Sequence, residues 1–357
     1  MNMLISELVE QISQAYHDGS ALRICGGNTK AFYARDIAAD DLRLNTLQGI
    51  VDYEPTELYI TAYAGTPLRV LEQALAEKQQ TFAFEPPAYG DAATIGGTVA
   101  CALSGPARAY RGGLRDSILG AEIINGKGQA LRFGGQVMKN VAGYDAARLM
   151  SGAFGTLGVM TKISLRVMPQ AEAELTLCFD ASLEDLQRWE SDWRQRSLPL
   201  TASYLEDGKL YARFSGNGDF LSKLEHELAA DKLSESKAFW QSVREQRRDA
   251  FTQAKTLWRI NLAAEQVDLG LPGKTIYEWG GSLRWYAQND DDSLNPTELA
   301  NIVQQHGGQL QLFRGNKMLT NEPMGHLEPA LEQLHHRLKL AFDPKKILNP
   351  GRLYSWC

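Results

Sequence analysis

The sequence predicts an α+β fold in two domains followed by a short tail. Its 357 residues suit about two domains. Glycine and tryptophan are unevenly distributed: 15 of the 32 glycines fall within residues 86–158, whereas every tryptophan lies at or beyond Trp189. This step in composition is followed by Pro169. We therefore expect domains at 1–170 and 171–340 and a tail at 341–357.

The chain opens with an amphipathic helix. Leu4, Leu8, Ile12 and Tyr16 recur at helical spacing and share one face. No basic stretch and no long apolar run accompany them, so this segment is typical of a folded helix and not of a signal peptide.

The rest of the first domain is expected to alternate strands and helices. Strands are predicted at 22–25, 58–62 and 117–124, and a helix at 66–78 with Pro67 in its first turn. The run Asn125-Gly126-Lys127-Gly128 separates two β-type segments. Asn-Gly favours a tight hairpin turn because its residues tolerate positive φ.

The second domain is expected to be an antiparallel sheet with helices on one face. Strand-like segments lie at 174–180, 209–214, 256–262, 280–287 and 309–313. Helical segments lie at 183–196, 221–228, 296–306 and 327–340.

Composition and charge exclude several classes of protein. The net charge is −6 and no Lys/Arg-rich block is present, so nucleic acid is not an expected partner. No apolar run approaches the 18 or more residues of a membrane-spanning helix. Cys25, Cys101, Cys178 and Cys357 lie far apart, so we expect neither an iron–sulfur cluster nor a metal site, and a reducing cytoplasm.

The segment Arg23–Lys30 is a candidate phosphate-binding turn. It follows a predicted strand and contains Gly26 and Gly27 beside small polar residues, so that successive N–H groups can point into one concavity. An ordinary strand-to-helix turn would have the same composition. The G-x-G-x-x-G signature is absent from this turn, and no P-loop motif occurs anywhere in the chain. Neither a simple dinucleotide site nor a P-loop nucleotide site is therefore indicated.

Three further motifs occur in the chain and are interpreted together with this turn. They are Glu85–Ala100 with its continuation to Ser104-Gly105 and Tyr110–Asp116, then Ser151–Met160, then Phe342–Arg352. Together with residues 23–30 the series resembles FAD-linked oxidases of the vanillyl-alcohol-oxidase type. More narrowly, residues 64–68, 84–87, 103–106, 133–145 and 281–285 resemble the smaller FAD-binding subunits of bacterial glycolate oxidases.

The resemblance implies an FAD-binding domain of the vanillyl-alcohol-oxidase (PCMH) type, then a second α+β domain with an antiparallel sheet. The tail is expected to return to the flavin region. The implied FAD-binding residues are Cys25, Gly26, Gly27, Asn28, Thr29, Lys30, Pro87, Thr94, Ile95, Gly96, Gly97, Ser104, Gly105, Tyr110, Arg115, Asp116, Gly155, Thr156, Gly158, Val159 and Asn349. Since no histidine lies between His17 and His226 to tether it, the FAD is expected to be non-covalent.

The same resemblance implies an activity and partners. The chain would be one subunit of an oxidase that converts glycolate to glyoxylate. Electrons would pass to an iron–sulfur subunit, because this chain has no cysteine cluster of its own, and a larger FAD-binding subunit would complete the complex. Any association with a membrane would come through a partner.

One departure from the family leaves the catalytic role of this chain open. Catalytic relatives carry an H-x-x-G-D-G-N-x-H stretch and a later E-H pair, and this sequence has neither. One hypothesis keeps the chemistry here, with an arginine such as Arg284 for the carboxylate and an unidentified base. The other makes this chain an electron-relay or structural subunit, and the missing histidines favour it.

The remaining histidines and several tryptophans have ordinary interpretations. The histidines are His226, His306, His326, His335 and His336, and none shows the family spacing. Packing or surface roles are expected for the last two, and core roles for Trp189, Trp193 and Trp285.

Overall fold

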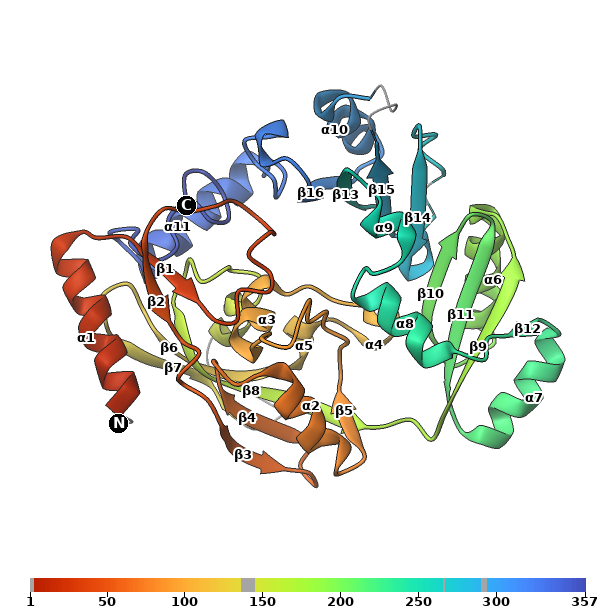
Figure 1. The fold of residues 1–357 in the computed structure, drawn as a ribbon, viewed down its shortest axis with the longest axis horizontal. Helices are drawn as coiled ribbons and strands as arrows, with labels where there is room; N and C mark the ends of the chain where they lie inside the picture. The colour runs from red at the N-terminus through yellow and green to blue at the C-terminus, as the bar shows by residue number, and fades with distance from the viewer. Residues whose placement is uncertain (1–2, 136–144, 266, 290–293) are drawn as a thin grey trace. The chain divides into compact units, whose positions relative to one another are not determined.

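The structure is a computed structural model that describes residues 3–135, 145–265, 267–289 and 294–357. These residues form two compact units, coloured by chain position in Figure 1. The first unit joins Met1–Leu103, Gly113–Gln170 and His326–Cys357, and the second joins Ser104–Gly112 and Ala171–Gly325. The domain limits given above stay predictions. The motif at 133–145 lies mostly outside the described residues.

The first unit contains an antiparallel sheet and a two-stranded parallel sheet. Strand order in the larger sheet is β3-β4-β8-β6-β7, and β5 pairs with the end of β8. Its strands are β3 (Ile50–Glu54), β4 (Tyr59–Tyr63), β5 (Gln80–Phe82), β6 (Ile118–Ile124), β7 (Ala130–Gly134) and β8 (Val159–Pro169). The parallel pair is β1 (Leu22–Cys25) and β2 (Asp40–Arg43). The helices are α1 (Met3–Asp18), α2 (Leu68–Ala76), α3 (Ile95–Cys101), α5 (Leu114–Ser117), α11 (Pro329–Phe342) and the 3₁₀ helix η1 (Ala146–Met150).

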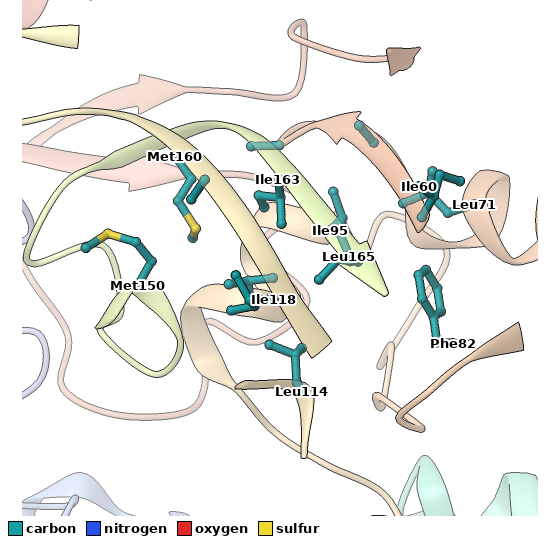
Figure 2. Packing of buried hydrophobic residues seen from close by; sticks show 14 of the residues in the cluster. Ile60, Leu71, Phe82, Ile95, Leu114, Ile118, Met150, Met160, Ile163 and Leu165 are labelled. Atoms are coloured by element: carbon teal, nitrogen blue, oxygen red, sulfur yellow. The ribbon is translucent and has the colours of Figure 1, made fainter. Parts of the chain in front are cut away.

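The core of this unit lies between the larger sheet and short helices. Along β8, Ile163 and Leu165 are buried among side chains from α2 and α3, including Leu71 and Ile95 (Figure 2). The intervening residues point to the other face of the sheet, where Ser164 hydrogen-bonds Thr61. This period of two explains why polar and apolar residues alternate along β8 from Lys162 to Val167.

The N-terminal helix is present and buries the predicted face, with Leu8 and Ile12 confirmed, but the other two fully buried positions differ from those expected. Ile5, Leu8, Ile12 and Ala15 are buried, whereas Leu4 and Tyr16 pack at the rim. The predicted helix at 66–78 is α2, which is shorter, and Pro67 precedes it as the N-cap residue.

The hairpin between β6 and β7 is confirmed, but its turn is not the tight Asn-Gly turn that we expected. Ile124 pairs with Ala130, which leaves a five-residue loop. In this loop the Asn125 side chain accepts hydrogen bonds from the N–H groups of Lys127 and Gln129. Only Gly128 has positive φ, and the Gly126 N–H donates to the distant carbonyl of Phe342.

The second unit is built on an eight-stranded antiparallel sheet of order β12-β9-β11-β10-β14-β15-β13-β16. Its strands are β9 (Ala173–Asp180), β10 (Leu200–Glu206), β11 (Lys209–Gly216), β12 (Asp231–Lys232), β13 (Thr256–Asn261), β14 (Lys274–Glu278), β15 (Leu283–Gln288) and β16 (Gln309–Arg314). Its helices are α4 (Arg108–Arg111), α6 (Leu183–Gln195), α7 (Gly218–Leu228), α8 (Ser236–Arg244), α9 (Asp249–Thr252), α10 (Pro296–Gln305) and the 3₁₀ helices η2 (Trp279–Gly281) and η3 (Lys317–Leu319).

The prediction of an antiparallel sheet is confirmed, but the prediction of helices on one face is wrong. On β10, Leu205 faces the core formed with α6 and α7. Its neighbour Tyr204 points to the opposite face, where its ring meets Phe239 of α8 and Phe251 of α9. Both faces of this sheet are apolar enough that helices must cover them. The sequences of the predicted strands did not show this.

Candidate functional site

The glycine-rich turn that follows β1 packs closely against a second segment, residues 88–94. A Cβ at Gly27 would lie 1.5 Å from the carbonyl oxygen of Ala92, and one at Gly26 would lie 2.5 Å from Thr94 Oγ1. Asn28 follows with φ of 58°, and the Thr29 hydroxyl donates to the carbonyl of Ala88 at 2.7 Å. Only residues without a side chain permit this approach, so the two glycines are required by packing.

The second segment leads into α3. Thr94 is its N-cap, and its hydroxyl accepts from the Gly97 N–H at 3.2 Å. Gly96 donates to the carbonyl of Ala64 at 2.8 Å, and a Cβ there would lie 2.8 Å from the same oxygen. A Cβ at Gly97 would meet only Thr94 Oγ1. Gly96 is therefore required for packing, whereas Gly97 presents its bare backbone to open space.

The third side of the site comes from residues 154–158 and the C-terminal tail. The tail runs parallel to β1, with a bridge between Leu22 and Leu348. Asn349 Oδ1 accepts from the Ile24 N–H at 2.7 Å, and its Nδ2 donates to the carbonyl of Phe154 at 2.6 Å. This one side chain joins three segments that are far apart in the sequence.

The three sides line one cavity that opens to solvent. Among the described residues that line it, Lys30 and Arg352 are the cations and no Asp or Glu occurs. The bare glycine backbones, the apolar walls and the net positive charge fit an elongated aromatic cofactor that carries phosphates, as FAD does.

Arg352 and Cys101 are further polar groups of the wall. The Arg352 guanidinium donates to the carbonyls of Tyr33 and Ala31, at 2.7 and 3.1 Å, which fixes the chain after the first turn. Burial lowers the pKa of Arg352 and raises the pKa of the Cys101 thiol. The Cys101 side chain therefore stays an uncharged thiol at neutral pH.

A buried ion pair between Lys339 and Asp343 stabilises the segments that form this part of the cavity wall. The Lys339 ammonium of α11 contacts Asp343 Oδ2 at 2.9 Å and donates to the carbonyls of Thr156 and Leu348, both at 2.8 Å. Asp343 in turn accepts from the N–H groups of Ile347 and Leu348. Neither side chain of the ion pair is exposed. The pair therefore ties the tail to the segment that carries Gly155.

The structure brings together just over half of the FAD-binding residues expected from the sequence. Those that line the cavity are Gly26, Gly27, Asn28, Thr29, Lys30, Thr94, Gly96, Gly97, Gly155, Gly158 and Asn349. As contacts to FAD they stay predictions.

The other expected residues do not line the cavity. Cys25, Pro87, Ile95, Thr156 and Val159 are buried nearby, the Thr156 hydroxyl donating to the carbonyl of Ala153. Arg115 and Asp116 are exposed on α5, where Asp116 accepts from the Gly113 N–H. Ser104, Gly105 and Tyr110 belong to the second unit.

The sequence analysis missed several residues of the wall. They are Ile24, Ala31, Leu44, Ala64, Ala100, Cys101, Phe154, Met160 and Arg352. Arg352 follows Asn349 by three residues within a motif already identified, so its charge was a usable signal. Ile24, Ala100, Phe154 and Met160 also lie within the identified motifs, but apolar residues in such motifs look like core residues.

Arg284 does not serve the catalytic hypothesis as expected. Its side chain is 1% exposed, and it donates to the carbonyls of Gly281 at 3.1 Å and Val267 at 2.7 Å. Burial lowers its pKa. The Arg284 side chain therefore stabilises a turn of the second unit.

The histidines also lie in ordinary surroundings. His335 and His336 pack on Tyr354 and Trp356, and His306 meets the carbonyl of Ile302 at the end of α10. Within the ranges that the structure describes, no three His, Cys, Asp or Glu side chains are grouped to hold a metal ion. The same ranges contain no helix that is long and apolar enough to span a bilayer.

Of the tryptophans expected in the core, Trp193 and Trp285 are buried, whereas Trp189 is only partly buried against it. Trp193 packs on Phe214 and Phe179, with Trp189 against Phe179. Trp285 donates from Nε1 to Glu278 at 2.7 Å.

Two family models match this chain. One is described as an FAD binding domain and matches residues 5–134, and the other, the FAD linked oxidases C-terminal domain, matches residues 324–353. The first covers the glycine-rich turn and α3, and the second covers α11 and the tail. These matches include most of the cavity wall.

Whole proteins are similar over most of their length. The glycolate oxidase subunit GlcE of Escherichia coli strain K12 is 40% identical over 98% of this chain and 97% of its own. The glycolate oxidase subunit GlcD of Bacillus subtilis strain 168 is 24% identical over 94% and 83%. An alkyldihydroxyacetonephosphate synthase structure aligns with a TM-score of 0.69 at 15% identity, covering 98% of this chain and 76% of that one. This last likeness is one of fold.

Proposed function

The chain belongs to the FAD-linked oxidases, and from this premise we propose that it is the FAD-binding subunit of a multisubunit glycolate oxidase. The observation that carries the proposal is the 40% identity with a glycolate oxidase subunit over 98% of this chain. In the proposed complex, glycolate is oxidised to glyoxylate and the electrons leave through an iron–sulfur subunit.

The cavity of the first unit would hold the FAD. The peptide groups of residues 26–29 and 96–97 and the charges of Lys30 and Arg352 suit its phosphates, while Phe154 and Met160 supply apolar contact. When bound, FAD supplies a two-electron acceptor. The described residues that line the cavity would bind it and place no carboxylate beside it.

We infer that the substrate is oxidised on a larger homologous subunit and that this chain has an electron-relay or structural role. Oxidation of a 2-hydroxy acid needs a base at the hydroxyl and a cation for the carboxylate. The described residues that line the cavity include no histidine, aspartate or glutamate, and Arg284 is occupied by backbone carbonyls. The similarity to a second type of glycolate oxidase subunit supports a pair of related flavoprotein subunits.

The iron–sulfur partner is the remaining part of the proposal. The four cysteines lie far apart in the sequence, and among the described residues no three His, Cys, Asp or Glu side chains are grouped. An iron–sulfur cluster needs about four thiolates around it. Any cluster that accepts electrons from this flavin must therefore be held by another subunit.

Glycolate is expected to leave the flavin of this chain oxidised when the chain is tested alone. The test is anaerobic addition of glycolate to the purified, FAD-loaded chain, followed by its absorbance near the flavin maximum. The reconstituted complex is the control, and its flavin should bleach. Stoichiometric bleaching in the isolated chain would contradict the proposal that the substrate is oxidised on a larger subunit. It would support the hypothesis that this chain is itself catalytic. Failure of the complex to bleach would contradict the choice of substrate.

FAD is expected to leave the chain on acid precipitation. The described wall of the cavity contains no histidine. Absorbance of the supernatant and the pellet after precipitation with trichloroacetic acid measures the partition. Flavin that stays in the pellet after washing would show a covalent bond.

A further inference from the structure

Residues 31–35, which we call the strap, follow the glycine-rich turn directly and are hydrogen-bonded to it. The Ala31 N–H donates to the carbonyl of Asn28 at 3.1 Å. The Tyr33 N–H donates to the carbonyl of Lys30 at 3.2 Å. Asn28 and Lys30 both line the cavity of the first unit. A displacement of the strap would therefore displace the turn that we assign to the phosphates of FAD.

The Arg352 guanidinium of the C-terminal tail holds the strap in place. It donates to the carbonyls of Ala31, Tyr33 and Arg35, the first two at 3.1 and 2.7 Å. In return, the Arg35 N–H donates to the carbonyl of Arg352 at 3.2 Å, and Arg35 Nε donates to that of Gly351 at 3.0 Å. The strap and the tail are thus bonded to each other from both sides.

The same tail holds a second point of the cavity wall. Asn349, three residues before Arg352, donates to the carbonyl of Phe154. The Phe154 and Tyr33 rings pack together with 5.4 Å between their centres, and both are buried. Asn349 and Arg352 therefore fix the two partners of one buried ring contact, each through the backbone carbonyl of one partner.

The surroundings of Arg352 depend on the shape of its side chain. Two nitrogen atoms of the guanidinium reach three carbonyls of the strap. Asp36 Oδ1 lies 3.9 Å away, and the Asp36 side chain is 78% exposed whereas that of Arg352 is 14% exposed. A guanidinium directs its N–H donors along fixed lines in one plane, whereas an ammonium is a compact charge on a flexible stem. A lysine would supply the charge without this fixed fork.

We infer that Arg352 is a positioning residue for the cofactor. Through the fixed geometry of its guanidinium it holds the strap, and through the strap it holds the turn at residues 26–30 in the arrangement that binds FAD. The inference rests on the proposed binding of FAD in this cavity and not on the identity of the substrate. It predicts that lysine, which keeps the charge, cannot replace Arg352.

The test compares Arg352→Lys and Arg352→Met with the matched control Lys345→Met in the full chain. The Lys345 ammonium also joins the tail to distant carbonyls, those of Tyr16 and His17 at 2.7 and 3.3 Å, but it does not line the cavity. Two quantities are measured on the chain stripped of FAD: the rate of trypsin cleavage after Arg35, and the Kd of added FAD from fluorescence quenching. Circular dichroism establishes that each variant is folded.

Both Arg352 variants should speed cleavage and weaken FAD binding by about tenfold or more, because hydrogen bonds from a buried charged group are lost. Lys345→Met should leave both quantities within about twofold of the parent. The inference is overturned if the Kd of Arg352→Lys rises by less than tenfold, if its cleavage is no faster, or if Lys345→Met weakens binding equally. Arg352→Lys decides the outcome alone if Arg352→Met does not fold.

The substitution Gly97→Val separates failure of this inference from failure of the proposed FAD site. If FAD bound outside this cavity, Gly97→Val and both Arg352 variants would all keep the Kd of the parent. If the inference alone were wrong, Gly97→Val would lose FAD while Arg352→Lys kept it. Neither readout uses glycolate or a partner subunit, so the proposed oxidase activity is tested separately.

Discussion

Gly97→Val should abolish retention of FAD by a chain that still folds. Gly97 lines the cavity, and a Cβ there would lie 3.2 Å from Thr94 Oγ1 with no other atom within 4 Å. A Cβ at this position of the cavity lining therefore meets the Thr94 hydroxyl and not a backbone atom of another segment. Overpacking costs of about 1–3 kcal/mol correspond to about 5- to 150-fold weaker binding. Flavin absorbance after gel filtration measures retention, and circular dichroism measures folding.

Gly216→Val is the matched control for this substitution. Gly216 ends a strand of the second unit, and the nearest atom to a Cβ there is 3.9 Å away, on Pro199. This variant should keep its FAD. Gly27→Val is not a useful test, because its Cβ would lie 1.5 Å from a backbone oxygen and the loop would be rebuilt. Full flavin occupancy in Gly97→Val would show that α3 does not contact FAD.

Lys339→Met should destabilise the first unit severely. The substitution leaves Asp343 as an unpaired buried carboxylate and removes the donor from the carbonyls of Thr156 and Leu348. Breaking a buried pair from one side costs about 3–5 kcal/mol. For a unit of this size we expect the midpoint of thermal unfolding to fall by about 6–20 °C. Differential scanning calorimetry of the FAD-free chain measures it.

Two further variants give this experiment its controls. Lys209→Met makes the same change in an ion pair with Asp180 that lies on the surface, and its unfolding midpoint should stay close to that of the parent. Lys339→Met combined with Asp343→Leu replaces the whole pair by apolar groups and should recover part of the loss. Equal midpoints for Lys339→Met and Lys209→Met would contradict a structural role for the buried pair.

The glycine-rich parts of the site could be predicted from the sequence because glycine has few alternatives. Where a backbone oxygen lies 1.5 Å from a virtual Cβ, as at Gly27, no other residue fits. The first turn, the start of α3 and the tail motif were therefore visible before the structure. Arg352 follows Asn349 in that motif and was not among the predicted residues, although an arginine there could be read from the sequence.

What the sequence could not show depends on contacts between distant segments. Lys339 looks like a surface residue of a leucine-rich helix, and only the convergence of Thr156 and Leu348 buries it. The hairpin loop at 125–129 is longer than an Asn-Gly turn, and its Gly126 N–H donates to the carbonyl of Phe342, a contact that no local pattern indicates. The central strands β10 and β14 were missed because β14 is short and the alternation in β10 is weak.

The interleaved chain path of the first unit has a consequence for biosynthesis. Its third segment, His326–Cys357, supplies Asn349, which joins Ile24 to Phe154 across the cavity wall. These residues are translated after the second unit, whereas the glycine-rich turn is translated before it. Domains that are contiguous in sequence fold while the ribosome is still at work. Here the wall is incomplete until Asn349 has been translated, so the growing polypeptide is expected to take up its vitamin-derived cofactor only after the second unit has been synthesised.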